Sequence, residues 1–137
     1  MMRILPALVL LVVAGMVLGS VSVFAQKYKV RTAPADFLSK TNPFTSEKDI
    51  KDGAKQYKGK CADCHGAKGE GDPEEPHVVA FTNKAWMQTR SDGQLFYITL
   101  KGGGSESEME AWGPDTDAGL SEKKIWQIIA YIRTLAK

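Results

Sequence analysis

The pentapeptide Cys61-Ala62-Asp63-Cys64-His65 contains both cysteines of the 137-residue chain, and the expected architecture follows from it. Two thiols three positions apart at a helix end can each add to one of the two vinyl groups on a porphyrin edge. The imidazole that follows can then turn beneath the ring and reach the iron. This spacing is the attachment pattern of c-type haem. We therefore expect one covalently bound haem c, attached through Cys61 and Cys64, with His65 as the proximal iron ligand.

Three other roles for these residues fit less well. A disulfide could form in an oxidising compartment, but a bridge that closes so short a loop would constrain the chain little. A thioredoxin-like redox pair needs a βαβ setting, whereas the neighbouring segments are predicted to be a helix and a glycine-rich loop. A zinc site would add His77 as a fourth ligand, but adjacent Cys64 and His65 cannot easily face one tetrahedral centre. Haem attachment is the favoured interpretation.

The N-terminal segment predicts export from the cytoplasm. A short basic start is followed by residues 4–25, which contain no charged side chain. The end of this stretch suits a signal-peptidase site, so we expect residues 1–25 to be a signal peptide cleaved between Ala25 and Gln26. The alternative is an uncleaved membrane anchor, because the uncharged stretch is long enough to cross a bilayer. Both alternatives place the rest of the chain outside the cytoplasm, as in a periplasm.

The rest of the chain is predicted to be all-α. Residues 26–45 show no regular period and are expected to form an extended lead-in to a domain over residues 46–137. Helical spacing of apolar residues recurs in about four segments, namely 47–60, a short stretch after Thr82, Ser91 to about Lys101, and Ser121 onward. The loops between them are long, and loops of such length are uncommon unless functional. About four short helices would bury only a thin core, and a large buried ligand would complete it.

A haem that only passes electrons normally has its sixth coordination position filled. Met109 lies in the long loop between the last two predicted helices, from which its thioether could reach the far face of the ring. Met87 falls in a predicted short helix, where packing is the usual role of methionine. His77 is so close to His65 in sequence that reaching the opposite face would be strained. The order of preference is Met109, then Met87, then His77.

These motifs together resemble the class I c-type cytochromes over about residues 46–135. Gly53 and Tyr57 precede the haem motif by the spacing seen in the first helix of that family, where the glycine lets the last helix cross at close contact. The resemblance implies that Ile128 and Tyr131 are their partners in this crossing. It also implies a cytochrome c fold wrapped around one haem with histidine and methionine ligands.

Two details of the resemblance concern the iron ligands. In the family the ligand methionine is commonly followed by proline and, soon after, by an aromatic residue. Trp112 fits this pattern, whereas Glu110 replaces the usual proline. A proline carbonyl in the loop after the motif often accepts a hydrogen bond from the proximal imidazole. The resemblance implies Pro76 in this role, with Pro73 as the alternative.

Charge and chemistry together indicate an electron carrier and not an enzyme. The net charge of +2 argues against nucleic-acid binding, which needs a concentrated basic face. Basic side chains are concentrated in residues 27–60 and acidic ones in residues 106–117, a separation that can orient a protein partner during encounter. We expect redox protein partners, met freely or within a larger respiratory complex. The alternative is a haem enzyme or gas sensor with an open or labile sixth position.

The surface beside the motif offers candidate docking contacts. Lys58, Lys60 and Lys68 flank the two cysteines in the sequence. Because electron transfer would use the exposed haem edge, we expect acidic groups of a partner to meet these lysines there.

Overall fold

The computed structural model describes residues 30–75, 77–117 and 119–137, and within them the chain forms helices and no strand. In chain order the helices are α1 (Ala35–Leu38), α2 (Glu47–Lys60), α3 (Ala62–His65), α4 (Lys84–Gln88), α5 (Asp92–Lys101) and α6 (Glu122–Leu135). The all-α class is confirmed. The four predicted helical segments are α2, α4, α5 and α6, whereas the single-turn helices α1 and α3 were not expected.

The N-terminal part of the chain lies largely outside this description. The predicted signal peptide, residues 1–25, and the first residues of the lead-in fall in the stretch 1–29, which the structure does not describe. Within the described residues, the helices are too short or too polar to traverse a bilayer.

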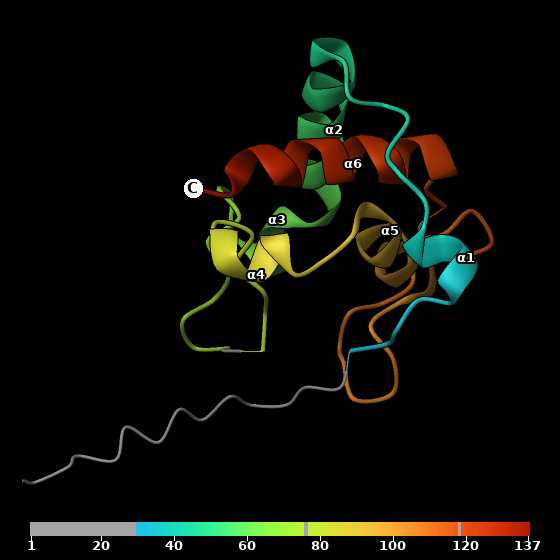
Figure 1. The fold of residues 1–137 in the computed structure, drawn as a ribbon. Helices are drawn as coiled ribbons and strands as arrows, with labels where there is room; N and C mark the ends of the chain where they lie inside the picture. Colours follow the sequence, from blue (N-terminus) through green and yellow to red (C-terminus); the bar gives the residue numbers. More distant parts are fainter. Residues whose placement is uncertain (1–29, 76, 118) are drawn as a thin grey trace, which may run out of the picture.

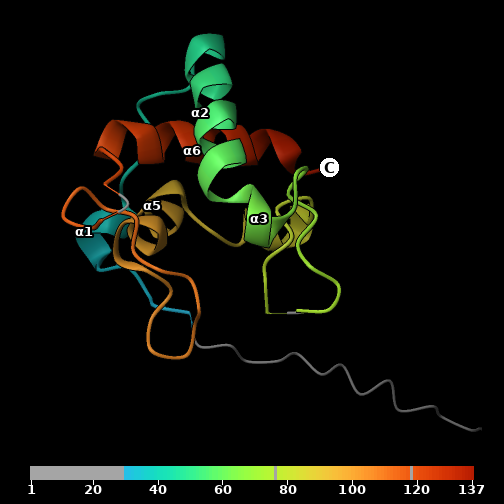
Figure 2. The ribbon, with the colours of Figure 1, turned by 180° about the vertical axis from the view of Figure 1, so that it is seen from behind.

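The crossing of α2 and α6 is the largest helix–helix contact of the described chain. Figures 1 and 2, which view the molecule from opposite sides, both show α6 crossing α2 at a steep angle. A Cβ atom added to Gly53 would lie 1.9 Å from the carbonyl oxygen of Gln127, so only glycine permits this approach. One turn later the ring of Tyr57 packs on that of Tyr131, with 5.2 Å between ring centroids. The crossing expected from the sequence is confirmed, with the Gln127 backbone as its nearest point.

Serine side chains set where the three longer helices begin. Ser46, Ser91 and Ser121 each accept a hydrogen bond from the backbone N–H three residues further on. This is the geometry of an N-cap, which satisfies one of the free donors of the first turn. All three helices therefore begin with a capped first turn.

The core lies between α5, α6 and the C-terminal half of α2. Its largest fully buried side chains are Tyr57, Met87, Phe96, Ile125 and Ile129. The rings of Phe96 and Trp126 stack with centroids 4.1 Å apart, which joins α5 to α6.

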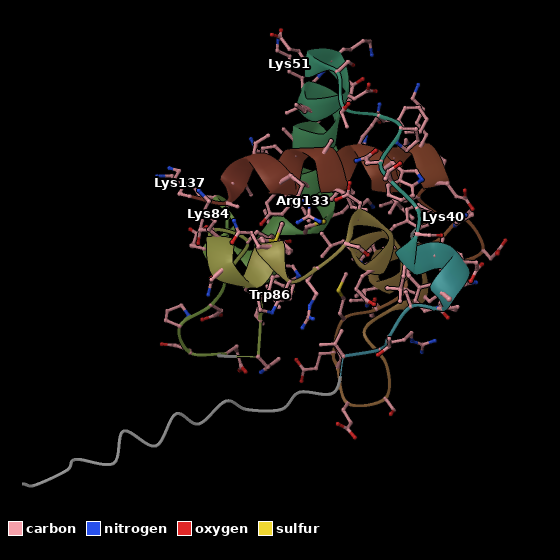
Figure 3. The ribbon with its side chains drawn as sticks, viewed as in Figure 1. Lys40, Lys51, Lys84, Trp86, Arg133 and Lys137 are labelled. Atoms are coloured by element: carbon pink, nitrogen blue, oxygen red, sulfur yellow. The ribbon has the colours of Figure 1, made fainter. Side chains whose placement is uncertain are left out.

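Arg133 ties the end of α6 to α4 and α5, as its labelled position in Figure 3 shows. Its Nε donates to Asp92 Oδ1 at 2.8 Å, and its two terminal nitrogens donate to the carbonyls of Met87 (2.7 Å) and Arg90 (2.5 Å). A half-buried guanidinium with three acceptors is well satisfied. The short helix α4 is held in place by this contact.

The lead-in differs from the extended segment that we expected. Residues 35–38 form α1, which packs against α5, and the ring of Phe37 lies 4.9 Å from that of Tyr97. Further on, Asn42 Nδ2 donates to the carbonyl of Trp126 at 2.7 Å. Pro34 and Pro43 interrupt the sequence period on either side of α1, but this segment is bonded across the domain and is not a loose tether.

The α2–α6 crossing predicts opposite effects for two glycines of the same helix. Gly53→Ala should lower the free energy of unfolding by about 2 kcal/mol or more, because its methyl group would meet backbone that cannot move aside. Gly59→Ala is the control, since no atom lies within 4 Å of its added Cβ; it should gain up to ~1 kcal/mol from helix propensity. Denaturant unfolding followed by circular dichroism measures both. Equal effects at the two positions would contradict the close crossing.

Candidate haem site

The cysteine motif sits at a break between two helices. Helix α2 ends at Lys60, and the backbone of Cys61 leaves helical geometry with φ −120° and ψ −30° while its N–H still donates to the Tyr57 carbonyl at 2.8 Å. The single turn of α3 then runs to His65, whose N–H donates to the Cys61 carbonyl at 2.9 Å. The break places both thiols and the imidazole on the wall of one cavity.

The orientation of the His65 imidazole is fixed by two neighbours. Its Nδ1 lies 3.1 Å from the carbonyl oxygen of Val79, and its ring stacks on Phe81 with centroids 4.6 Å apart. A carbonyl only accepts hydrogen bonds, so Nδ1 carries the proton and Nε2 keeps its lone pair. Burial lowers the pKa of His65, and the Val79 carbonyl opposes this shift in part. A neutral imidazole with a free Nε2 is the form that ligates metal.

The partner of Nδ1 is a correction to the sequence analysis. Pro73 and Pro76 were the candidates for the accepting carbonyl, whereas the structure places Val79 there. Pro76 lies outside the described residues. Neither Val79 nor Phe81 carried a motif signal, because the loop that contains them has no period.

Backbone hydrogen bonds fold the loop after the motif back against the imidazole. The hydroxyl of Tyr57 donates to the Gly66 carbonyl at 2.7 Å, and the Gly71 N–H donates to the His65 carbonyl at 2.9 Å. Gly66 has φ +83°, a left-handed conformation that glycine adopts without strain. These bonds bring the end of the loop, with Val79 and Phe81, beneath the ring of His65.

The cavity is apolar and of ligand size. Its volume is about 380 Å³, within the range of roughly 300–1,000 Å³ typical of small-molecule sites. Its apolar walls come from the loops and from α4, α5 and α6, and include Phe81, Trp86, Leu95, Ile98, Trp112 and Ile128. In Figures 1 and 2 the described parts of the two long loops, 66–75 with 77–83 and 102–117 with 119–121, lie below α6, on the side away from the N-terminal end of α2.

The three candidates for the sixth ligand occupy different places. Met109 and His77 line the same cavity as His65. Met87 is only 1% exposed, belongs to the core cluster and is not among the residues lining this cavity. His77 Nδ1 lies 3.3 Å from Glu75 and its Nε2 lies 3.6 Å from Glu108, so both ring nitrogens face carboxylates. The cavity therefore favours Met109 and disfavours Met87.

The donor set fits a covalently attached porphyrin. Cys61 and Cys64 are free thiols in the structure, whereas the disulfide alternative requires a bond between them. Burial, aided by the charge of Cys64, raises the pKa of the Cys61 thiol to about 12. The zinc alternative finds no support, since no three histidine, cysteine or acidic side chains cluster as a metal site among residues 30–75, 77–117 and 119–137. Thiols, an imidazole and an apolar wall are what haem c needs.

Comparisons with known proteins agree with this fit. The cytochrome c family model matches residues 50–136, whereas no curated protein matches the chain by sequence. Among solved structures, the c-type cytochrome KustC0563 is 23% identical with a TM-score of 0.54, over 63% of this chain and 99% of that one. Cytochrome cL of Methylophaga aminisulfidivorans is 23% identical with a TM-score of 0.54, over 69% of this chain and 60% of that one.

A second cytochrome cL, from Hyphomicrobium denitrificans, is 21% identical with a TM-score of 0.54, over 77% of this chain and 65% of that one. The chain spans less than two thirds of either cytochrome cL, and at these identities the likeness shows a shared fold. The family model, by contrast, covers well over half of the chain, including the motif and the α2–α6 crossing. The chain belongs to the cytochrome c family, whose cofactor is covalently bound haem c.

Proposed function

We propose that this protein is a monohaem electron carrier that works outside the cytoplasm and passes single electrons between redox protein partners, as in a respiratory chain. The observation that carries the proposal is the shared cavity: Cys61, Cys64, His65 and Met109 are all among the residues that line it. Cys61 and Cys64 would hold the haem covalently. His65, through Nε2, and Met109, through its sulfur, would be the iron ligands.

The chain's own residues would raise the reduction potential of the haem. Haem, when bound, supplies a one-electron ferric–ferrous couple. A thioether is a soft, neutral ligand that favours the ferrous state and raises the reduction potential relative to a second imidazole. The apolar walls act in the same direction, because a low-dielectric surrounding disfavours the extra positive charge of the ferric state. The Val79 carbonyl fixes the tautomer and orientation of His65.

Replacing each methionine by leucine tests the sixth ligand. Met109→Leu should abolish the weak long-wavelength charge-transfer band that methionine-ligated ferric haem shows, and should lower the reduction potential. Met87→Leu is the matched control, because it makes the same chemical change in the core, away from the cavity lining. Absorption spectra of the oxidised proteins and a redox titration measure both effects.

The same spectra decide between the electron carrier and its alternative. A five-coordinate high-spin spectrum of the unaltered protein would favour a haem enzyme or gas sensor with an open sixth position. A band lost in Met87→Leu and kept in Met109→Leu would overturn the ligand assignment. A bis-histidine spectrum would point to His77.

Mass spectrometry tests attachment and export together. In a host with haem-attachment machinery, the mature protein should begin at Gln26 and weigh its polypeptide plus one haem. Cys61→Ser or Cys64→Ser should leave at most one thioether bond, so that denaturation with heavy-metal cleavage releases haem more readily. A colourless mature protein with the bare polypeptide mass would contradict the proposal. Retention of residues 1–25 would instead support the membrane-anchored form.

Two lysines of α2 test the docking face. Lys58 lies one turn from the cysteine motif, whereas Lys51, labelled in Figure 3, lies toward the far end of the same helix. Both are exposed, and two helical turns separate them by about 10 Å along the axis. Lys58→Glu should slow electron transfer from an acidic partner and weaken its dependence on ionic strength. Lys51→Glu, the control, should change the rate much less.

Lys60 is a less suitable test residue although it flanks the motif. Its Nζ lies 5.9 Å from the ring centroid of Trp112, a residue that lines the cavity. A substitution there would disturb the wall of the site as well as the surface charge. Equal transfer rates for Lys58→Glu and the unaltered protein would place docking on another face.

A further inference from the structure

Gln94 is a buried polar side chain that holds the N-terminal segment of the domain. It lies on α5, is 8% exposed, and uses both ends of its amide. Its Oε1 accepts from the Ala33 N–H at 2.9 Å, and its Nε2 donates to the Arg31 carbonyl at 2.8 Å. Burying an amide is costly unless it is hydrogen-bonded. Gln94 is satisfied by backbone sixty residues away in sequence.

The same segment is bonded in turn to the loop that carries Met109. The Arg31 N–H donates to the Gly103 carbonyl at 2.8 Å, and the Gly103 N–H donates to the Met109 carbonyl at 2.9 Å. The backbone at Gly104, with φ +107°, faces Arg31, since a Cβ added there would lie 3.5 Å from the Arg31 Cβ. A continuous series of hydrogen bonds thus connects the Gln94 amide to the backbone of Met109.

The loop also has contacts within itself. A Cβ added to Gly102 would lie 2.9 Å from the Met109 carbonyl oxygen, and the Met109 N–H donates to Ser107 Oγ at 3.2 Å. Residues 102–110 contain no regular secondary structure beyond these contacts. The conformation of such a loop depends on individual contacts and not on a repeating hydrogen-bond pattern. The bond from residue 31 is therefore a principal external restraint on it.

We propose that Gln94 is a positioning residue for Met109: by clamping residues 31–33 against the Gly103 carbonyl, it fixes the loop 102–110 and holds the methionine at the cavity wall. The importance of this clamp for iron ligation rests on the proposed function. Val30, directly before residues 31–33, lines the cavity, so the chain enters the domain at the site itself.

The test replaces Gln94 by methionine, which keeps nearly the same length and volume but forms neither hydrogen bond. In the holoprotein, hydrogen exchange of residues 102–110 should become roughly tenfold faster, as expected when a buried hydrogen bond is lost. The methionine charge-transfer band should disappear at a lower temperature than the helical circular dichroism.

Asn42→Leu is the matched control, because it removes a side-chain bond from the same N-terminal segment to α6 and not to the Met109 loop. It should lower overall stability while the band and the helical signal are lost together. Unchanged exchange of residues 102–110 in Gln94→Met, or exchange no faster than in Asn42→Leu, would overturn the proposal. If the unaltered protein lacks the band and Gln94→Met still speeds exchange, the Met109 ligation is wrong and the clamp stands.

Discussion

The close crossing of α2 and α6 is the constraint on which the rest of the structure depends. Without a side chain at Gly53, the backbone of Gln127 comes into direct contact with α2. This contact fixes the C-terminal end of α2, from which the cysteine motif departs, relative to Ile128 on α6, which lines the cavity. Tyr57 joins this crossing to the motif: its ring packs on that of Tyr131, and its hydroxyl donates a hydrogen bond to the Gly66 carbonyl just after the motif. The helix pair therefore positions the proximal side of the site.

The two sides of the site are held by different kinds of contact. The proximal side is local in sequence: Cys61, Cys64 and His65 share one helical break, and Val79 and Phe81 follow within sixteen residues of the motif. The distal side is assembled from distant segments. Met109 is kept in place by a loop that is bonded through Gly103 to the N-terminal segment and by that segment to α5. Local contacts cost less loop-closure entropy than distant ones, so the distal side is the one more easily loosened.

This difference explains how much the sequence alone could predict. The motif, the starts of the predicted helices at residue 47, Ser91 and Ser121, and the awkward Gly53 each carry a local physical signal. The haem c cofactor predicted from the motif agrees with the family, and the helix starts and the close crossing agree with the structure. The Val79 carbonyl carries no such signal, because any residue supplies one. Helix α1 was missed because its single turn lies between prolines, and its position depends on packing against α5. Gln94 lies in the first turn of α5 beside Leu95 and Phe96, and no motif or spacing marked it.

The buried polar residue Gln94 has a structural explanation: it connects α5 to the N-terminal segment and, through that segment, to the loop of Met109. A small domain wrapped around a large cofactor has little apolar surface of its own to define the conformation of its loops. Hydrogen bonds from a buried side-chain amide to the backbone can select one loop conformation. Other conformations of the loop would leave the amide without partners, which is costly. Gln94 restrains the N-terminal segment and, through it, the loop of Met109. Residues 31–33 are therefore bonded to the packed helices although they precede α2, and Val30 directly before them lines the cavity.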